Sequence, residues 1–348
     1  MSEIAAELGL RVLNEGYALT RAEALALCAD ALDPYDLMYW ANKIRRKYRG
    51  DEVKGCSIIS VKTGACSEDC SFCAQSSRWK TNSPVHDFLP PENIKAAAQA
   101  AKDSGSFALG LVAQGYGPKD SDLDTFVAYM DAMDEVGGVE KHINVGIMSE
   151  SQIARLKNHG MVCCGHNLET SRRFFPRICS THAYDERVET LKALKRQGVK
   201  ICSGALFGMG EVWEDRVDLA FDLRDLGAGN IPMNFLNRIE GTPLQNTVPM
   251  EPLEILRTVA LYRYILFDRD LGVYGGREVN LRDLQALIFF AGASALMVGN
   301  YLTTAGRPAE IDRQMVEDLK LHFAPPRHLD ALGPAGHPEP IPARAAGG

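Results

Sequence analysis

The sequence predicts an α/β protein, a (β/α)8 barrel of the TIM type that follows an N-terminal helical extension. The first observation is that short apolar, β-rich segments alternate with amphipathic segments of helical period between residues 51 and 322. The second is that about eight such pairs follow one another over roughly 250 residues, which is the size of one such barrel. The third is that residues 1–50 contain only helical patterns. An open, doubly wound sheet is the alternative architecture.

The individual elements follow from these patterns in order. Residues 18–33 carry apolar side chains at helical spacing, and 34–50 form a second helical segment that starts at Pro34. The predicted strands are residues 57–62, 107–113, 142–148, 161–167, 200–208, 230–236, 271–276 and 295–300. The predicted helices after them are residues 91–105, 124–137, 149–160, 185–198, 214–227, 252–267 and 280–292. Residues 323–348 are rich in Pro, Gly and Ala without an apolar period, which predicts a disordered tail.

The composition argues against several classes of protein. The 38 Lys and Arg residues against 45 Asp and Glu give a net charge of -7, which is unfavourable for binding nucleic acid or membrane surfaces. No run of about 18 apolar residues predicts a membrane span, and the N-terminus lacks the pattern of a secretory signal. Nine cysteines are too sparse for a disulfide framework in a chain of this length. We therefore expect a cytoplasmic protein with no nucleic-acid or membrane partner.

Three of the cysteines form the most informative motif of the sequence. Cys66, Cys70 and Cys73 are spaced as C-x3-C-x2-C directly after the first predicted strand, at the end of the barrel where active sites lie. Three thiolates can hold three irons of a [4Fe–4S] cluster, and the absence of a fourth cysteine nearby leaves one iron open to another ligand. A structural zinc site needs a fourth ligand, so zinc or incidental cysteines are the less favoured interpretations.

This motif after the first strand of a barrel is similar to the signature of the radical S-adenosylmethionine (SAM) superfamily. Within that superfamily the chain resembles the biotin synthases, in the same order from about residue 50 to 320. The resemblance rests on residues 60–81, 165–171, 181–191, 202–211, 231–244, 275–285 and 291–306. It implies that SAM binds the open iron, that a 5′-deoxyadenosyl radical takes hydrogens from dethiobiotin, and that an auxiliary iron–sulfur cluster donates the sulfur that makes biotin. It also implies a flavodoxin- or ferredoxin-type electron donor and a homodimer.

The resemblance assigns roles to single residues. The three cysteines match the cluster ligands, and Phe72 matches an aromatic beside the cluster and adenine, although its type fits a core position equally well. Glu169 matches an acidic residue on the SAM ribose hydroxyls, whose protons a carboxylate accepts. Arg187 matches the arginine that pairs with the SAM carboxylate through a planar fork of donors. The plainer alternatives are a charge at a helix N-terminus for Glu169 and an exposed helical arginine for Arg187.

The resemblance also implies a binding site for the substrate's cyclic urea. Asn167 and Asn234 match the asparagines that hold this ureido ring. An amide side chain can donate to the ring carbonyl and accept from a ring N–H, so the residue type suits the task. A single asparagine at a strand end is otherwise a turn or cap residue.

The auxiliary cluster is where the sequence departs from the family pattern. Cys202 and Arg277 match the third cysteine and the unusual arginine of the family's [2Fe–2S] site, and are therefore the residues expected to act in sulfur donation. At the positions of the first and second cysteines stand Ala108 and His142. Two of the four expected ligands are thus missing.

Other residues are candidates for the missing ligands, in a four-iron variant of the auxiliary cluster. They are His142, Cys179 and one of the adjacent pair Cys163 and Cys164. Side chains alternate along a strand, so only one of the pair faces the barrel interior, and Asn167 shares a face with Cys163. The plainer alternative is that these cysteines are small buried hydrophobic residues.

Two other functions remain open from the sequence. The missing ligands are consistent with a related radical SAM enzyme that performs a rearrangement or maturation reaction without sulfur insertion. A different class is a non-catalytic barrel that binds zinc or a metabolite. Biotin synthesis is favoured because Cys202, Arg277, Asn167 and Asn234 would have no evident joint use in either alternative.

Overall fold

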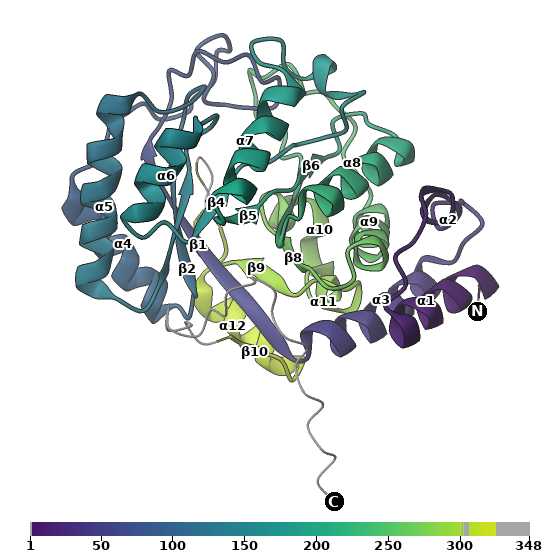
Figure 1. Ribbon diagram of the computed structural model, residues 1–348. Coiled ribbons are helices and arrows are strands. Elements are labelled where there is room, and N and C mark those ends of the chain that lie inside the picture. Colours follow the sequence, from purple (N-terminus) through teal and green to yellow (C-terminus); the bar gives the residue numbers. More distant parts are fainter. Residues whose placement is uncertain (1, 301, 303–305, 325–348) are drawn as a thin grey trace, which may run out of the picture.

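The computed structural model describes residues 2–300, 302 and 306–324, which form a parallel barrel with helices around it (Figure 1). Every pair of neighbouring strands is parallel, and β9 (Ala295–Met297) pairs with β1 (Glu52–Lys62) to close the ring. The predicted (β/α)8 barrel is therefore confirmed, and the open sheet is excluded. In such a barrel the carboxyl ends of all strands meet at one rim, where loops from distant parts of the chain come together.

Between β1 and β9 the ring contains one strand that is broken in two. The other strands are β2 (Ala108–Ala113), β3 (Glu140–Asn144), β4 (Cys163–Gly165), β5 (Lys200–Cys202), β6 (Ala205–Phe207), β7 (Asn230–Phe235) and β8 (Asp270–Val273). The predicted strand 200–208 is β5 and β6, with Ser203 and Gly204 between them. A Cβ at Gly204 would lie 1.9 Å from the carbonyl oxygen of Pro232 on β7, so only glycine allows the two strands to approach here.

The helices that cover the barrel begin and end close to their predicted bounds, with one exception. They are α4 (Pro91–Asp103), α5 (Leu123–Val136), α6 (Glu150–Asn158), α7 (Tyr184–Arg196), α8 (Trp213–Leu226) and α9 (Pro252–Ile265). The predicted helix 280–292 is wrong as a continuous element. It is replaced by α10 (Arg277–Leu281), a 3-10 turn and α11 (Leu287–Phe290), because Arg282 has a φ of 51°, which an α-helix does not allow.

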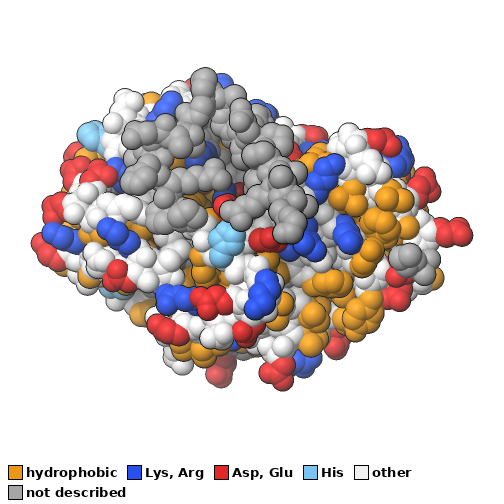
Figure 2. Space-filling model, turned by 90° about the horizontal axis from the view of Figure 1, so that it is seen from below, with side chains coloured by type: hydrophobic (Ala, Val, Ile, Leu, Met, Phe, Trp, Pro, Cys, Tyr) orange, Lys and Arg blue, Asp and Glu red, His pale blue; other side chains and the backbone are white. Residues whose placement is uncertain are grey.

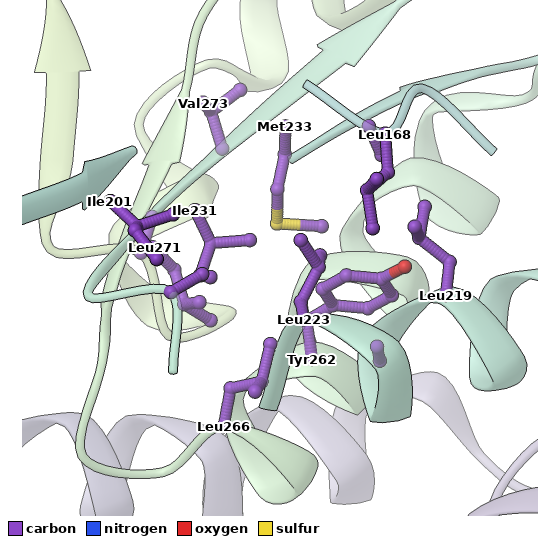
Figure 3. Packing of buried hydrophobic residues seen from close by; sticks show 14 of the residues in the cluster. Leu168, Ile201, Leu219, Leu223, Ile231, Met233, Tyr262, Leu266, Leu271 and Val273 are labelled. Carbon is purple, nitrogen blue, oxygen red and sulfur yellow. The ribbon is translucent and has the colours of Figure 1, made fainter. Parts of the chain in front are cut away.

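The main core lies between the outer face of the strands and the helices. Figure 3 shows Leu168, Ile201, Ile231, Met233, Leu271 and Val273 from the strand side against Leu219, Leu223, Tyr262 and Leu266 from the helix side. Because side chains alternate along each strand, the residues between these positions face the barrel interior. A smaller cluster there contains Cys56, Phe107, Ala108, Tyr274, Ala295 and Met297. The barrel therefore has an apolar outer layer and an interior that holds thiol and hydroxyl groups.

The N-terminal extension is helical as predicted and packs on the barrel's outer helices. It consists of α1 (Glu3–Glu15), α2 (Arg21–Ala26) and α3 (Pro34–Arg49), so the segment 18–33 is helical over only part of its length. The Tyr264 hydroxyl of α9 donates to the carbonyl oxygen of Ala5 over 2.9 Å. Arg21 donates to both carboxylate oxygens of Asp218 on α8. These contacts fix the extension against α8 and α9.

The C-terminal part returns to the first strand. After α12 (Ala309–Asp318), β10 (His322–Phe323) pairs with the start of β1, and the Ala324 N–H donates to the Val53 carbonyl oxygen over 2.8 Å. Sheet pairing thus extends past the predicted boundary at residue 322, while 325–348 of the predicted tail lie outside the described residues. Within the described part, none of the helices is long and apolar enough to cross a membrane.

Candidate functional site

The loop after β1 brings Cys66, Cys70 and Cys73 into one compact turn. The Cys66 N–H donates to the Gln75 carbonyl oxygen over 2.9 Å, and the Ser77 N–H donates to the Cys66 carbonyl oxygen over 2.8 Å. The Cys73 N–H donates to the Cys70 carbonyl oxygen over 3.0 Å. These bonds within the loop, together with one from the Ser71 N–H to the Ile178 carbonyl oxygen over 2.8 Å, hold the three cysteines at the carboxyl end of β1.

Backbone N–H groups act on two of the three sulfurs in this loop and lower the pKa of each thiol. They belong to Glu68 and Gly115 at Cys66, and to Gln75 and Ser76 at Cys73. Burial nevertheless raises the pKa of both thiols, that of Cys73 to about 11, and contact with Cys179 raises the pKa of Cys70. A bound metal ion deprotonates such thiols outright, and N–H groups aimed at sulfur are typical of iron–sulfur ligands. The loop thus fits a three-thiolate cluster site.

A cavity of about 270 Å³ lies beside this loop. Its walls include Lys62 and Ser67 on the loop side, and Gly115, Tyr116 and Lys119 from the segment that follows β2. Gly115 both borders the cavity and acts through its backbone N–H on the pKa of Cys66. A molecule in the cavity would therefore lie directly against the cysteine loop.

Three of the predicted ligand-binding residues meet at the end of β4. The Asn167 side chain lowers the pKa of the neighbouring Glu169 carboxyl, and Arg187 Nη1 donates to the Asn167 carbonyl oxygen over 2.7 Å. Burial raises the pKa of Glu169, while the positive charge of Arg187 opposes that shift. The Glu169 charge also acts on Cys73, so this group faces the cysteine loop. The structure therefore brings together the acidic and basic groups that the sequence assigned to one ligand.

The two predicted substrate residues both use their amides within the protein. Asn167 Oδ1 accepts the Gly204 N–H over 3.1 Å. Asn234 Nδ2 donates to the Ala205 carbonyl oxygen over 3.0 Å, and its Oδ1 accepts the Gly275 N–H over 2.9 Å. Each amide oxygen has a second lone pair and each amide nitrogen a second N–H, so both retain capacity for a ligand. Their role in substrate binding stays a prediction, as does that of Phe72, which is half-buried against the main core.

A second set of thiols lies inside the barrel, and one of its members was missed by the sequence analysis. The neighbouring Cys202 thiol, together with burial, raises the pKa of Cys163, and Asn230 Nδ2 donates to Cys202 Sγ over 3.1 Å. The Tyr274 hydroxyl lies 3.5 Å from Asn230 Nδ2 and donates to the Sγ of Cys56 on β1 over 3.4 Å. We call Cys56, Cys163 and Cys202 the barrel thiols. They come from three different strands and are connected through two polar side chains.

The surroundings of the barrel thiols fit a bound group. All three are buried, and burial raises the pKa of Cys56 to about 12. Asn230 Oδ1 and Ser203 Oγ are also buried, and neither has a hydrogen-bond partner among the described residues. Buried polar atoms without partners are rare in folded proteins and often indicate a ligand, ion or water. An iron–sulfur cluster would use the thiols as ligands, and its sulfides are acceptors for a hydroxyl such as that of Ser203, which follows Cys202 in the chain.

The register of the strands explains the missing family ligands. Ala108 pairs directly with Cys56 on β1, and His142 pairs directly with Cys163 on β4. Paired residues of neighbouring strands lie on the same face of a sheet. Each position that lacks the expected cysteine therefore has a cysteine beside it on the next strand. His142 itself is buried, and its Nε2 contacts Glu140 Oε2 over 3.2 Å.

Two candidate ligands of the auxiliary site lie elsewhere. Cys164 is the outward-facing member of its pair and belongs to the main core. Cys179 lies at the other site, where its Sγ is 3.9 Å from Cys70 Sγ. Strand alternation turns Cys163 inward and Cys164 outward, which agrees with the prediction that only one of the pair faces the interior. The loop after β4 carries Cys179 towards the cysteine loop, so the prediction that Cys179 joins Cys202 is wrong.

Arg277 is the second correction to the predicted auxiliary site. Its Nη1 and Nη2 donate to the two carboxylate oxygens of Asp312 over 3.0 and 2.9 Å, and Nη1 also donates to Gln285 over 2.9 Å. Both members of this ion pair are fully buried. Since α10 begins beyond the end of β8, the guanidinium is directed at α12, and the contacts of Cys202 are instead Cys163 and Asn230.

We expect Arg277→Met to destabilise the fold and to leave the barrel thiols unaffected. Removing one partner of a buried ion pair costs roughly 3–5 kcal/mol, because the Asp312 carboxylate would stay buried without its cation. Urea denaturation measures the loss, with the exposed Arg282→Met as a matched control. A variant that keeps full stability but loses iron from the barrel would contradict this assignment.

Comparisons with known proteins match most of the chain. Residues 60–223 match the model of the Radical SAM superfamily, and residues 232–322 match that of the Biotin and Thiamin Synthesis associated domain. The chain is 44% identical over 318 residues to a biotin synthase of Geotalea uraniireducens, which covers 90% of this chain and 96% of the relative. It is 45% identical over 309 residues to a biotin synthase of Geobacter sulfurreducens, which covers 88% and 94%.

Solved structures with the same fold are more distant in sequence. The structure of a methylornithine synthase superposes with a TM-score of 0.78 at 22% identity, over 91% of this chain and 97% of that one. The FeFe-hydrogenase maturase of Carboxydothermus hydrogenoformans gives a TM-score of 0.79 at 17% identity, over 92% and 79%. At these identities the structures support the barrel fold and nothing more specific.

Proposed function

This chain belongs to the biotin synthase family of radical SAM enzymes, and from that premise we propose how its residues divide the conversion of dethiobiotin to biotin. Cys66, Cys70 and Cys73 hold the [4Fe–4S] cluster that binds SAM, and the barrel thiols hold an auxiliary iron–sulfur cluster. When bound, the first group supplies the electron that cleaves SAM, and the second supplies the sulfur of the product. The side chains of the protein bind and orient SAM and dethiobiotin.

The observation that carries this proposal is the pairing of each missing family ligand with a nearby thiol. Cys56 lies beside Ala108, and Cys163 lies beside His142, while Cys202 keeps its expected place. Three thiols are also the number of cysteines in the C-x3-C-x2-C motif of the loop site, although Cys179 lies beside that motif, with its Sγ 3.9 Å from Cys70 Sγ. We therefore favour a four-iron auxiliary cluster with one open iron over the [2Fe–2S] form.

The groups between the two sites bind SAM and substrate in this proposal. Glu169 accepts hydrogen bonds from the ribose hydroxyls of SAM, and Arg187 donates hydrogen bonds to the carboxylate of SAM. Phe72 packs beside the cluster and the adenine. The free lone pairs and N–H groups of Asn167 and Asn234 bind the ureido ring of dethiobiotin and orient it between the loop site and the barrel thiols. Both asparagines are held by backbone hydrogen bonds, which keeps their side chains in fixed directions.

The protein partners of the reaction are also proposals from family membership. We expect the electron to come from a flavodoxin- or ferredoxin-type protein, and the chain to act as a homodimer. Leu10, Tyr35 and Tyr39 of α1 and α3 are 45%, 57% and 40% exposed, and Figure 2 shows hydrophobic side chains gathered on the side of the molecule where Figure 1 draws these helices. A second copy that packs there would cover this surface.

We expect Tyr35→Glu with Tyr39→Glu to convert the dimer to a monomer without unfolding it, since both side chains are exposed. Burying two uncompensated carboxylates in an interface would weaken association by at least ~10-fold. Light scattering coupled to size-exclusion chromatography measures the mass, and circular dichroism checks the fold. A wild-type chain that is monomeric at all concentrations would contradict the dimer.

An assay of products tests the proposed function as a whole. The anaerobically reconstituted enzyme is mixed with dethiobiotin, SAM and a low-potential reductant, and biotin, methionine and 5′-deoxyadenosine are quantified. We expect biotin, with two molecules of 5′-deoxyadenosine for each biotin because two C–H bonds are broken. Formation of 5′-deoxyadenosine without any thiolated product would overturn sulfur insertion and favour a radical rearrangement or maturation reaction.

A further inference from the structure

Residues 179–182 hold both acidic side chains of the cysteine loop. Asp69 Oδ1 accepts the N–H groups of Ser180 and Thr181 over 2.9 and 3.1 Å. Glu68 Oε2 accepts a hydrogen bond from His182 Nδ1 over 2.7 Å. Both acidic residues lie between the first and second cysteines of the motif. The segment after β4 therefore fixes the part of the loop that lies between two sulfur ligands.

The same histidine contacts the arginine proposed to bind the SAM carboxylate. Arg187 Nε and Nη2 lie 3.1 and 2.9 Å from His182 Nε2. A guanidinium can only donate hydrogen bonds, so this imidazole nitrogen is the acceptor. The ring proton is then on Nδ1, where it points at Glu68, and the network assigns the tautomer. Glu68, His182 and Arg187 thus form a directed chain of hydrogen bonds.

These contacts leave a specific pair of donors free on Arg187. A guanidinium has five N–H groups, and three of them are engaged by His182 and by the Asn167 carbonyl oxygen. One N–H remains on Nη1 and one on Nη2. Two such donors at the end of the planar group match the two oxygens of a carboxylate. The side chain is thereby oriented for bidentate binding before any ligand arrives.

The imidazole itself is held rigidly. Its side chain is 3% exposed, and its ring meets those of Phe175 and Tyr116 edge to face at centroid distances of 5.7 and 6.3 Å. The Arg187 guanidinium also lies over the Phe175 ring at 5.5 Å. One aromatic side chain therefore packs on both members of the pair and limits their rotation.

A metal site is the competing interpretation of this cluster, because Cys70, Cys179 and His182 lie close together. Cys179 Sγ is 3.4 Å from Nδ1 and 3.7 Å from Nε2 of the imidazole, which places the sulfur beside the ring and not along one lone pair. Both ring nitrogens already have partners in Glu68 and Arg187. The hydrogen-bonded arrangement is therefore favoured.

We propose that His182, oriented by Glu68, is the positioning residue for Arg187 and that this pair sets the affinity of the enzyme for SAM. The proposal rests on the proposed function of Arg187. It links the loop that carries the cluster ligands to the residue that binds the carboxylate of the cosubstrate. Removing the histidine frees Arg187 to rotate away, while the hydrogen bonds between backbone groups of the cysteine loop remain.

The test measures SAM affinity in the anaerobically reconstituted holoenzyme by equilibrium dialysis with labelled SAM. His182→Leu is expected to weaken SAM binding by about 10–100-fold, the range seen for supporting residues of metal sites, with unchanged iron content and dethiobiotin affinity. His182→Gln should recover part of the loss, because its Oε1 can still accept from Arg187. His159→Leu, at an exposed histidine, should bind SAM as the wild type does.

A double-mutant cycle with Arg187→Met separates the possible outcomes. If His182 acts through Arg187, adding His182→Leu to Arg187→Met changes SAM affinity by less than about 2-fold. A His182→Leu enzyme with wild-type SAM affinity overturns the inference, and so does a loss of iron in the Leu and Gln variants alike. If Arg187→Met also binds SAM normally, the proposed role of Arg187 fails. If Arg187→Met weakens SAM binding and His182→Leu does not, the proposed role of His182 is wrong and that of Arg187 is unaffected.

Discussion

Replacing Cys202 by alanine is expected to give an enzyme that still cleaves SAM but makes almost no biotin. The substitution removes one barrel thiol and leaves the cysteine loop intact, because the two sets of thiols share no residue. Biotin formation should fall by about 100-fold or more, the upper end of what even supporting residues of metal sites contribute. Mass spectrometry of 5′-deoxyadenosine and biotin from the same reaction measures both steps.

Cys56→Ala should have the same effect, and it is the sharper test because this residue is assigned from the structure alone. Cys163→Ala should behave likewise. Cys164→Ala is the matched control, since it removes the adjacent thiol, which faces the main core. We expect Cys164→Ala to lower the stability of the fold and to leave biotin formation unchanged. If Cys164→Ala abolishes biotin formation while Cys56→Ala does not, the assignment of the barrel thiols is wrong.

The second large effect is expected for the combined variant Cys66→Ala, Cys70→Ala and Cys73→Ala. It should form neither 5′-deoxyadenosine nor biotin, because the site that binds and reduces SAM is gone. SAM cleavage should fall by more than about 100-fold, since first-sphere ligands matter at least as much as their supporting residues. The variant should nevertheless retain the iron and sulfide of the barrel site, measured by colorimetric analysis after anaerobic reconstitution.

Two outcomes would contradict this prediction. Continued SAM cleavage by the combined variant would show that another site activates SAM. Complete loss of iron, with the fold intact by circular dichroism, would show that the barrel thiols hold no cluster of their own. Adding Cys202→Ala to the variant is the control, because it should remove the remaining iron.

The sequence was sufficient to predict the barrel and the cysteine loop. Alternating strand and helix patterns determine a parallel barrel, and a motif confined to residues 66–73 needs no long-range contact to be recognised. Local signals failed where the backbone departs from regular geometry. The break at Ser203 and Gly204 depends on the close approach of β7, and the positive φ of Arg282 that ends α10 has no clear signal in its neighbours.

The auxiliary site was the part that sequence could not place. The first strand was predicted to start at residue 57, one position after Cys56, which concealed the fact that this thiol faces the barrel interior. Which residue lies beside Ala108 or His142 is a matter of strand register, and register follows from the closed ring as a whole. For the same reason, no local pattern in the sequence indicates that Arg277 pairs with Asp312 on α12.

The most direct test of the account is a crystal structure of the reconstituted enzyme with an anomalous difference map at the iron absorption edge. The account predicts two separate groups of iron peaks. One lies within bonding distance of Cys66, Cys70 and Cys73, and the other within bonding distance of Cys56, Cys163 and Cys202. A single group of peaks at the loop, or a second group bound by Cys179 or Arg277, would contradict it.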